Sequence, residues 1–185
     1  MYTLQFDGLF RRIQTKSHGN PGIMCYGWLI LRDGSLVAKG HGGYAHWKIA
    51  TSNGAEYLAL IAGLEALLDM NITDETILIQ GDAKTIIEQM QNLVQTHSPR
   101  IKQFHRQARR LCRNLKDVQW NWTPRRENHS ADRLTRRALQ QIRSSEPVYF
   151  APDVLTLIPT SSRHGLQPIL HLTQYQSDGT LLDAF

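Results

Sequence analysis

The segment from residue 55 to residue 64 constrains the fold of this chain most, because it is apolar on almost every side and Glu56 is its only charge. Residues 51–53 (Thr-Ser-Asn) precede it and are typical N-cap residues, so a helix is predicted from there to about Met70. A helix that is apolar nearly all round is expected to be central and buried. The remaining elements must therefore pack around it.

Strand-like segments stand on both sides of this helix in the sequence. Alternation of apolar and polar residues predicts a first strand over 2–7, and a hairpin turn at Asp33-Gly34 joins two further strands, 23–31 and 36–44. Residues 9–22 are expected to form a polar loop. The later elements are strands over 76–81 and 118–123 and helices over 83–92, 99–115 and 130–142. The resulting order, βββαβααβα, predicts an α/β fold with a five-stranded mixed sheet flanked by helices.

The composition changes after Ser145, where prolines at 147, 152, 159 and 168 interrupt short apolar runs. We therefore predict one domain over 1–144 and an irregular extension over 145–185. The extension is expected to pack on the domain or to dock a protein partner, because its apolar residues argue against full disorder.

Size and charge set broad limits on function. The 185 residues suffice for one domain with a sizeable core, and a net charge of +5 permits an acidic partner. The two cysteines, Cys25 and Cys112, lie far apart in apolar surroundings and are predicted to be buried free thiols in a reducing compartment. The chain has neither a signal-peptide pattern nor a run of 18 apolar residues, so a cytosolic protein that makes no membrane contact is expected.

Four acidic residues stand at the ends of predicted elements or inside apolar ones: Asp7, Glu56, Asp82 and Asp132. Sites in open α/β sheets lie beyond the carboxyl ends of parallel strands, and the first and fourth strands are free to be neighbours. Convergence of the four carboxylates is therefore expected. Because an unpaired buried charge is strongly disfavoured, such a cluster requires a cation.

A site of four carboxylates without Cys or His ligands suits Mg²⁺, or Mn²⁺, rather than zinc. Two such ions about 4 Å apart can activate a water and stabilise the leaving oxygen in a displacement at phosphorus. Without metal the carboxylates repel one another, and at least one pKa should rise. Each acid taken alone is more often a cap or a turn residue, so the inference rests on the set of four.

The motifs around these acids resemble those of type 1 ribonuclease H, especially its compact archaeal and plant-like branch. The matching stretches are Phe6-Asp7-Gly8, 19–22 (Gly-Asn-Pro-Gly), 26–28 (Tyr-Gly-Trp), 51–60, 81–84 and 124–134, and the resemblance covers about residues 1–142. It implies a ribonuclease H-like catalytic domain over 1–144 that hydrolyses the RNA strand of RNA–DNA hybrids, leaving 3′-hydroxyl and 5′-phosphate ends. It also implies that Asp7, Glu56, Asp82 and Asp132 are catalytic and bind two Mg²⁺ ions.

Three features depart from the family pattern. The loop before residues 19–22 is longer and more basic than usual, and no basic protrusion is present because residues 94–99 lead directly into the next helix. Trp122 stands ten residues before Asp132, where many members have a histidine. The role of that histidine is either vacant or is taken by Arg125, Arg126 or His129.

The resemblance also implies contacts with the substrate. Asn20 and Asn53 would meet the 2′-hydroxyls that distinguish RNA from DNA, although an ordinary turn residue and an ordinary cap residue are the alternatives. Thr51 would help to hold a DNA phosphate, with Arg125 or Arg126 assisting. The helix after Pro99 has basic residues at helical spacing, which would either neutralise phosphates or form a solvated outer face: Lys102, Arg106, Arg109, Arg113 and Lys116.

Three classes of function fit these features. The first is an endoribonuclease acting on RNA–DNA hybrids, and the second is a non-catalytic nucleic-acid-binding or scaffold module with the same fold. The third is a related polynucleotidyl transferase of the resolvase or integrase type. A buried Glu56 gives a binding module no advantage, and the contexts of Asn20 and Asn53 favour the hybrid nuclease over a transferase.

Overall fold

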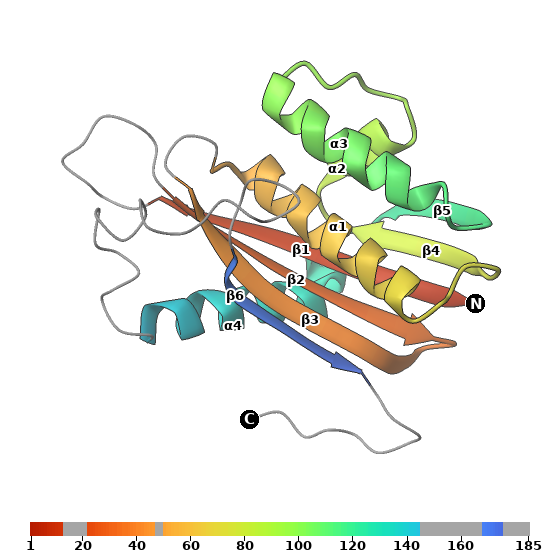
Figure 1. The fold of residues 1–185 in the computed structure, drawn as a ribbon, viewed down its shortest axis with the longest axis horizontal. Coiled ribbons are helices and arrows are strands. Elements are labelled where there is room, and N and C mark those ends of the chain that lie inside the picture. Colours follow the sequence, from red (N-terminus) through yellow and green to blue (C-terminus); the bar gives the residue numbers. More distant parts are fainter. Residues whose placement is uncertain (13–21, 47–49, 145–167, 176–185) are drawn as a thin grey trace.

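A mixed sheet forms the centre of the computed structural model, which describes residues 1–12, 22–46, 50–144 and 168–175 (Figure 1). Its strand order is β5-β4-β1-β2-β3-β6, with β1–β4 and β4–β5 parallel and the other pairs antiparallel. The strands are β1 (Tyr2–Arg12), β2 (Gly22–Arg32), β3 (Ser35–His46), β4 (Thr76–Gly81), β5 (Asp117–Trp122) and β6 (Pro168–Tyr175).

Helices cover both faces of this sheet. The first helix, α1, and the third, α3, lie on one face, and α4 lies on the other (Figure 1). The helices are α1 (Ser52–Asp69), α2 (Lys84–Met90), α3 (Pro99–Cys112) and α4 (His129–Ser144), with a short 3₁₀ turn at Arg125–Glu127 before α4. The predicted order βββαβααβα is therefore confirmed, and the α/β class with it. None of the helices in the described ranges is long and apolar enough to cross a membrane.

The helix α1 is buried along most of its length, as the apolar sequence predicts. Leu60, Leu64 and Leu67 are fully buried against the inner face of the sheet, in the same core cluster as Leu4 and Phe6 of β1. Burial of each such side chain contributes about 1.5–3 kcal/mol relative to exposure. The core therefore fixes the position of α1, and with it the position of Glu56.

The strand β1 is longer than the sequence predicted. Residues 9–12 were expected in a polar loop, but they continue β1 and pair with residues 22–25 of β2. The physical reason is that both faces of the sheet are covered here: Leu9 packs on the small cluster beneath α4, and Phe10 packs on the main core. Residues 13–21, the rest of the expected loop, lie outside the described part of the chain.

The predicted irregular extension contains a sixth strand, so the expected count of five strands is one too low. Strand β6 pairs with β3 in antiparallel register from Ala38–Tyr175 to Tyr44–Pro168. Without β6, the edge of β3 would present unpaired N–H and C=O groups, which a further strand satisfies. The other residues of the extension, 145–167 and 176–185, lie outside the described part of the chain.

Candidate active site

The parallel pairing of β1 and β4 places two of the predicted acids side by side. Phe6 pairs with Gly81, and the next residue of each strand is an acid, Asp7 and Asp82. The expected neighbourhood of the first and fourth strands is thus confirmed. The site lies at the carboxyl ends of these strands, where ligand sites of open α/β sheets occur.

Two glycines let the helices approach the sheet closely at this point. A Cβ atom on Gly8 would lie 2.2 Å from the backbone nitrogen of Glu56, so glycine is required where α1 meets β1. Gly27 pairs with Asp7 across the sheet, and a Cβ atom there would lie 2.6 Å from Cβ of Leu134 in α4. Because neither glycine has a side chain, α1 and α4 approach Asp7 closely, one from each face of the sheet.

Three of the four predicted acids form a cluster. Asp7, Glu56 and Asp82 each offer a carboxylate oxygen, and these oxygens lie within 4.8 Å of one another. The backbone N–H of Gly8 donates to Glu56 Oε2 at 3.0 Å, which orients that carboxylate. Because all donors are oxygens, the cluster fits a hard divalent cation such as Mg²⁺.

Burial and mutual repulsion perturb these acids. Burial, followed by repulsion from Asp82, raises the pKa of Asp7 to about 7. Burial, followed by the charges of Asp7 and Asp82, raises the pKa of Glu56 well above its usual range. The expected rise in pKa is confirmed, and it means that a cation would have to displace protons from this cluster near neutral pH.

The fourth predicted acid, Asp132, lies beside the cluster but is paired with arginines. The hydroxyl of Thr135 lies 3.0 Å from Asp7 Oδ2 and 2.8 Å from the main-chain oxygen of Asp132. The Asp132 carboxylate accepts hydrogen bonds from Arg125 at 2.7 Å and from Arg136 at 2.6 Å. Partial burial alone would raise its pKa, but the hydrogen bonds from Arg136 and Arg125 outweigh burial and lower the pKa.

Asn128 is a residue of this site that stands in one of the matching motifs but to which the sequence assigned no role. Its side chain is 1% exposed and donates from Nδ2 to the main-chain oxygen of Phe6 at 2.8 Å, with Asp82 Oδ1 at 3.5 Å. It therefore ties the segment before α4 to both acid-bearing strands. The Asn-x-x-x-Asp spacing to Asp132 was the available signal, and Thr135, one turn further along α4, could have been found from the same helical spacing.

Trp122, ten residues before Asp132, contacts the site through the main chain of Asp82. Its indole N–H donates to the main-chain oxygen of Asp82 at 3.0 Å, and 45% of the residue is exposed. Trp122 ends β5 opposite Gly81 of β4. The indole group thus supports the turn that carries Asp82 but supplies no ring nitrogen that could accept a proton.

The other predicted substrate residues are distributed around the cluster. The Thr51 hydroxyl accepts from the N–H of Gly54 at 3.0 Å, which makes it the N-cap of α1, and Asn53 is exposed in the first turn of the same helix. Arg126 is exposed and pairs with Glu127, and His129 is exposed at the start of α4. Asn20 lies outside the described residues.

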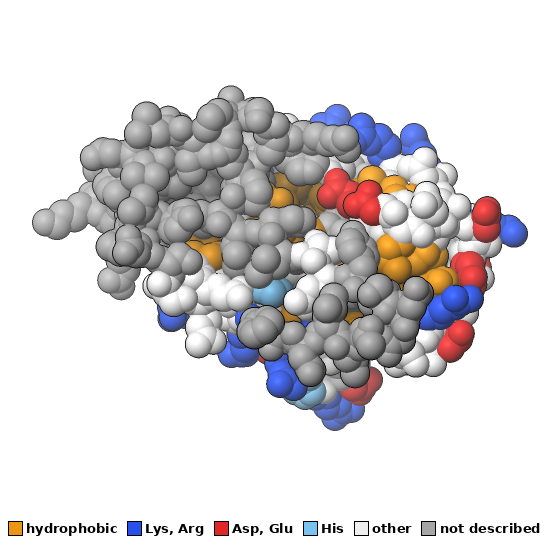
Figure 2. Space-filling view, turned by 60° about the horizontal axis from the view of Figure 1, so that its bottom comes forward, with side chains coloured by type: hydrophobic (Ala, Val, Ile, Leu, Met, Phe, Trp, Pro, Cys, Tyr) orange, Lys and Arg blue, Asp and Glu red, His pale blue; other side chains and the backbone are white. Residues whose placement is uncertain are grey.

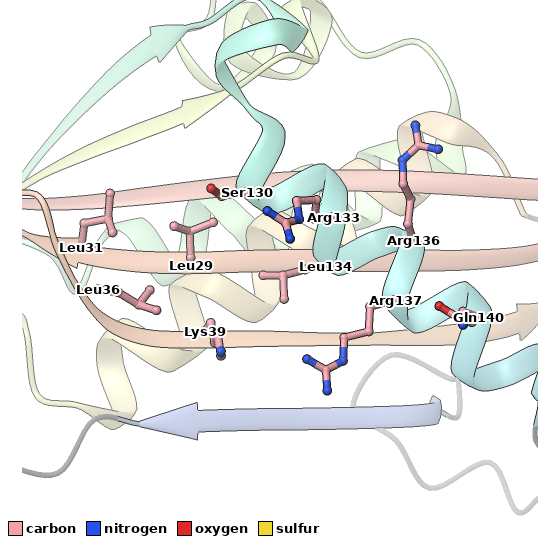
Figure 3. A pocket seen from close by; sticks show the side chains of 10 residues that line it. All are labelled: Leu29, Leu31, Leu36, Lys39, Ser130, Arg133, Leu134, Arg136, Arg137 and Gln140. Atoms are coloured by element: carbon pink, nitrogen blue, oxygen red, sulfur yellow. The ribbon is translucent and has the colours of Figure 1, made fainter. Parts of the chain in front are cut away.

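Basic side chains gather along two helices. Exposed on α3 are Lys102, Arg106 and Arg110, and Arg113 is exposed at its C-cap. Of the other residues expected on this face, Arg109 is half-buried and donates to the main-chain oxygen of Met90 at 2.9 Å, and Lys116 lies beyond the end of the helix. A cavity of about 730 Å³ beside α4 has a floor of leucines and a basic rim, and it is lined by Leu29, Leu31, Leu36, Lys39, Ser130, Arg133, Leu134, Arg136, Arg137 and Gln140 (Figure 3). The end of the sheet where β1 begins instead carries charges of both signs (Figure 2), including the pairs of Arg32 with Glu75 and of the Met1 amino group with Asp33. Positive charge is therefore concentrated along α3 and α4 rather than at that end.

The sheet order, the helices on both faces and the acids at the ends of β1 and β4 define a ribonuclease H-like protein. Comparison with known proteins agrees: a family model described as reverse transcriptase-like matches residues 14–138. The chain is 36% identical over 124 residues to ribonuclease HI of Halobacterium salinarum, an alignment that covers 66% of this chain and 60% of that protein. The crystal structure of ribonuclease H1 from the same archaeon matches with a TM-score of 0.63 and 33% identity, covering 76% of this chain and 98% of that one. The chain therefore belongs to the type 1 ribonuclease H family.

Two further relatives are less similar in sequence to this chain, and one of them is a much longer protein. A bifunctional protein of Mycobacterium tuberculosis is 31% identical over 147 residues, which is 78% of this chain and 40% of that protein. The LC11 ribonuclease H1, solved in complex with an RNA/DNA hybrid, has a TM-score of 0.63 at 21% identity, covering 78% of this chain and 100% of that one, and shows the shared fold alone. The chain thus spans 60% and 40% of the lengths of the halobacterial and mycobacterial proteins.

Proposed function

We propose that this chain is a divalent-metal-dependent endoribonuclease that hydrolyses the RNA strand of RNA–DNA hybrids, leaving 3′-hydroxyl and 5′-phosphate ends. The observation that carries the proposal is the approach of three carboxylates, Asp7, Glu56 and Asp82, to within 4.8 Å of one another at the carboxyl ends of β1 and β4. Membership of the type 1 ribonuclease H family supports the same conclusion.

The proposed cofactor is Mg²⁺, with Mn²⁺ as the other ion that an all-oxygen site takes. Asp7, Glu56 and Asp82 would hold one ion, and Asp132 would hold a second. When bound, such ions activate a water and stabilise the leaving oxygen in an in-line displacement at phosphorus. Glu56 would in addition orient the attacking water, because its carboxylate is itself held by the N–H of Gly8.

The hybrid would be held by residues on both sides of the cluster. At the start of α1, the exposed Asn53, with Asn20, would read 2′-hydroxyls across the shallow minor groove, and Thr51 would lie near a phosphate of the DNA strand. Arg125, Arg126 and His129 lie on the other side, before and at the start of α4. The exposed basic face of α3 would neutralise further phosphates without sequence preference.

The proposal extends to domain organisation and location. Residues 1–144 would form the catalytic domain, and 145–185 an extension that adds β6 to the sheet and offers a candidate docking segment for a protein partner. A cytosolic location is supported by the thiols of Cys25 and Cys112, which are free, with burial raising the pKa of Cys25 to about 12.

Cleavage of a substrate panel tests the proposed activity against its alternatives. Purified protein is incubated with Mg²⁺ and labelled RNA–DNA hybrid, double-stranded RNA or branched DNA, and the products are sized. Cuts in the RNA of the hybrid alone are expected. Preferential cutting of branched DNA would instead indicate a resolvase-like transferase, and binding of the hybrid without any cleavage would indicate a scaffold module.

A further inference from the structure

Both carboxylate oxygens of Asp132 are occupied by arginine. Arg125 Nη2 lies 2.7 Å from Oδ1, while Arg136 Nε lies 2.6 Å from Oδ2 and its Nη2 lies 3.3 Å from Oδ1. The other three acids form the cluster without Asp132. In this arrangement a cation at Asp132 would have to replace a guanidinium group and to approach two positive charges.

The two arginines are nevertheless free to change partner. The side chains of Arg125 and Arg136 are 65% and 63% exposed, whereas that of Asp132 is 12% exposed. They come from different elements, the 3₁₀ turn before α4 and the second turn of α4. A guanidinium group binds phosphate with the same forked geometry that it uses for a carboxylate.

We propose that Arg125 and Arg136 prevent Asp132 from binding the second ion. Both arginines leave Asp132 when they bind a phosphate of the nucleic acid. The inference rests on the proposed function and deepens it. Asp132 is then a ligand that becomes available only with substrate in place, and the free protein binds one divalent ion instead of two. The arginine pair thus links recognition of the phosphate backbone to completion of the metal site.

The neighbouring arginines of α4 provide a matched comparison. Arg133 and Arg137 lie on the same helix and line the cavity beside it. Figure 3 shows Arg137 pointing from α4 toward β3 and β6, whereas Arg136 points the opposite way. Replacement of Arg133 and Arg137 therefore removes the same two charges without touching the contacts of Asp132.

Titration of the full chain with Mn²⁺ in the absence of nucleic acid, followed by the electron paramagnetic resonance signal of free Mn²⁺, tests the inference. Wild type should bind one tight ion. The double variant Arg125→Gln/Arg136→Gln should keep that ion, which reports an intact cluster, and bind a second one at least roughly tenfold more tightly than wild type. The control Arg133→Gln/Arg137→Gln should behave as wild type, and Asp132→Asn added to the first double variant should abolish the second ion.

The outcomes separate the inference from the proposed function. Failure of wild type to bind any ion would refute the proposed metal site itself. One ion in wild type and no gain in the Arg125/Arg136 variant, or two tight ions in wild type, would refute the inference while leaving the proposed function standing.

Cleavage kinetics provide the second readout, because they test the exchange with phosphate. The Arg125→Gln/Arg136→Gln variant should reach half-maximal rate at a lower Mg²⁺ concentration than wild type, while its KM for the hybrid rises roughly tenfold or more from the loss of two phosphate contacts. An unchanged KM would show that these arginines do not take the phosphate, and would overturn the inference.

Discussion

Glu56 is held in a position that disfavours the charged form of its side chain. Burial is the largest cause of its raised pKa, followed by repulsion from Asp7 and Asp82. Its neighbours on α1 are core residues such as Ala55 and Tyr57, both fully buried. The residue therefore destabilises the ion-free protein, which is the expected cost of a functional carboxylate in this place.

Substitution of Glu56 by Gln should consequently raise stability and abolish activity together. In EDTA at neutral pH, the free energy of unfolding should rise by about 1–2 kcal/mol, because Gln needs neither a buried charge nor a proton taken up on folding and still accepts the bond from Gly8. Thermal unfolding measures the gain, and a hybrid cleavage assay measures the loss. Asp69→Asn, an exposed position at the end of α1, is the control and should change neither quantity; a less stable Glu56→Gln protein would contradict the account.

The pKa of Asp7 predicts how stability depends on pH. In the folded protein it is raised to about 7, whereas an unfolded Asp titrates near about 3.9. The folded state therefore holds a proton that the unfolded chain has released. The stabilising contribution of protonated Asp7 is fully present below about pH 4 and is lost as the pH rises toward 7.

Urea unfolding of wild type and Asp7→Asn in EDTA tests this dependence. The stability of wild type relative to the variant should fall between about pH 4 and pH 7, by at most about 4 kcal/mol. Saturating Mg²⁺ should move the fall to lower pH, since the ion displaces the proton. A difference that stays constant across this range would show that Asp7 is not protonated in the ion-free protein.

Asn128 should matter for both stability and activity, because its buried amide joins the main chain of β1 to the segment before α4. Asn128→Ala leaves the main-chain oxygen of Phe6 without its 2.8 Å hydrogen bond, and we expect a loss of about 1–3 kcal/mol. Cleavage should fall as well, because Asp82 loses its contact with the Asn128 amide and the main chain beside Asp7 loses its hydrogen bond. Chemical denaturation and single-turnover cleavage measure the two effects. Asn121→Ala, exposed on β5, should be neutral; if both variants behave alike, Asn128 has no special role.

At the scale of elements, the sequence predicted those whose periodicity is strong and local. The pattern of 55–64, apolar except for Glu56, and the alternation in β1 were sufficient to predict these elements, because burial acts on each residue of the element. The end of β1 and the strand β6 were missed for a common reason. Their pairing depends on what covers the sheet at Leu9 and on the open edge of β3, and neither is visible within a short window of sequence.

The strand β6 should stabilise the molecule through its pairing with β3. Deletion of residues 145–185 removes the backbone hydrogen bonds of the β3–β6 pairing, which runs from Ala38–Tyr175 to Tyr44–Pro168. Each of these bonds contributes about 0.5–1.5 kcal/mol net. For a net loss of about 2 kcal/mol, Tm should fall by roughly 4–8 °C, which differential scanning calorimetry measures. Deletion of residues 176–185 alone keeps β6 and should lower Tm less. Equal Tm values for the full chain and the long deletion would mean that β6 adds nothing to the stability of the domain.

At the scale of the whole molecule, the site arises where three layers meet. The parallel strands β1 and β4 present Asp7 and Asp82 together, α1 brings Glu56 past Gly8, and α4 brings Thr135 and Asp132 past Gly27. The order of motifs along the chain was enough to predict that Asp7, Glu56 and Asp82 would approach one another, whereas Asp132, also expected in this group, lies beside the cluster. The pairing of Asp132 with Arg125 and Arg136 was not predictable, because competition for one carboxylate is decided by side-chain geometry in three dimensions.

The most direct test of the central claim is the rate at which Mg²⁺-dependent cleavage of the RNA strand of a hybrid proceeds in Asp82→Asn. The control is Asp117→Asn, an exposed aspartate at the start of β5 that lies outside the cluster. Loss of groups that merely support a metal ligand already lowers activity about 10–100-fold, so loss of a ligand should lower the rate by more than about a hundredfold. The account predicts this fall for Asp82→Asn and a normal rate for Asp117→Asn. A full rate in Asp82→Asn would show that the three-carboxylate cluster is not the centre at which RNA is cut.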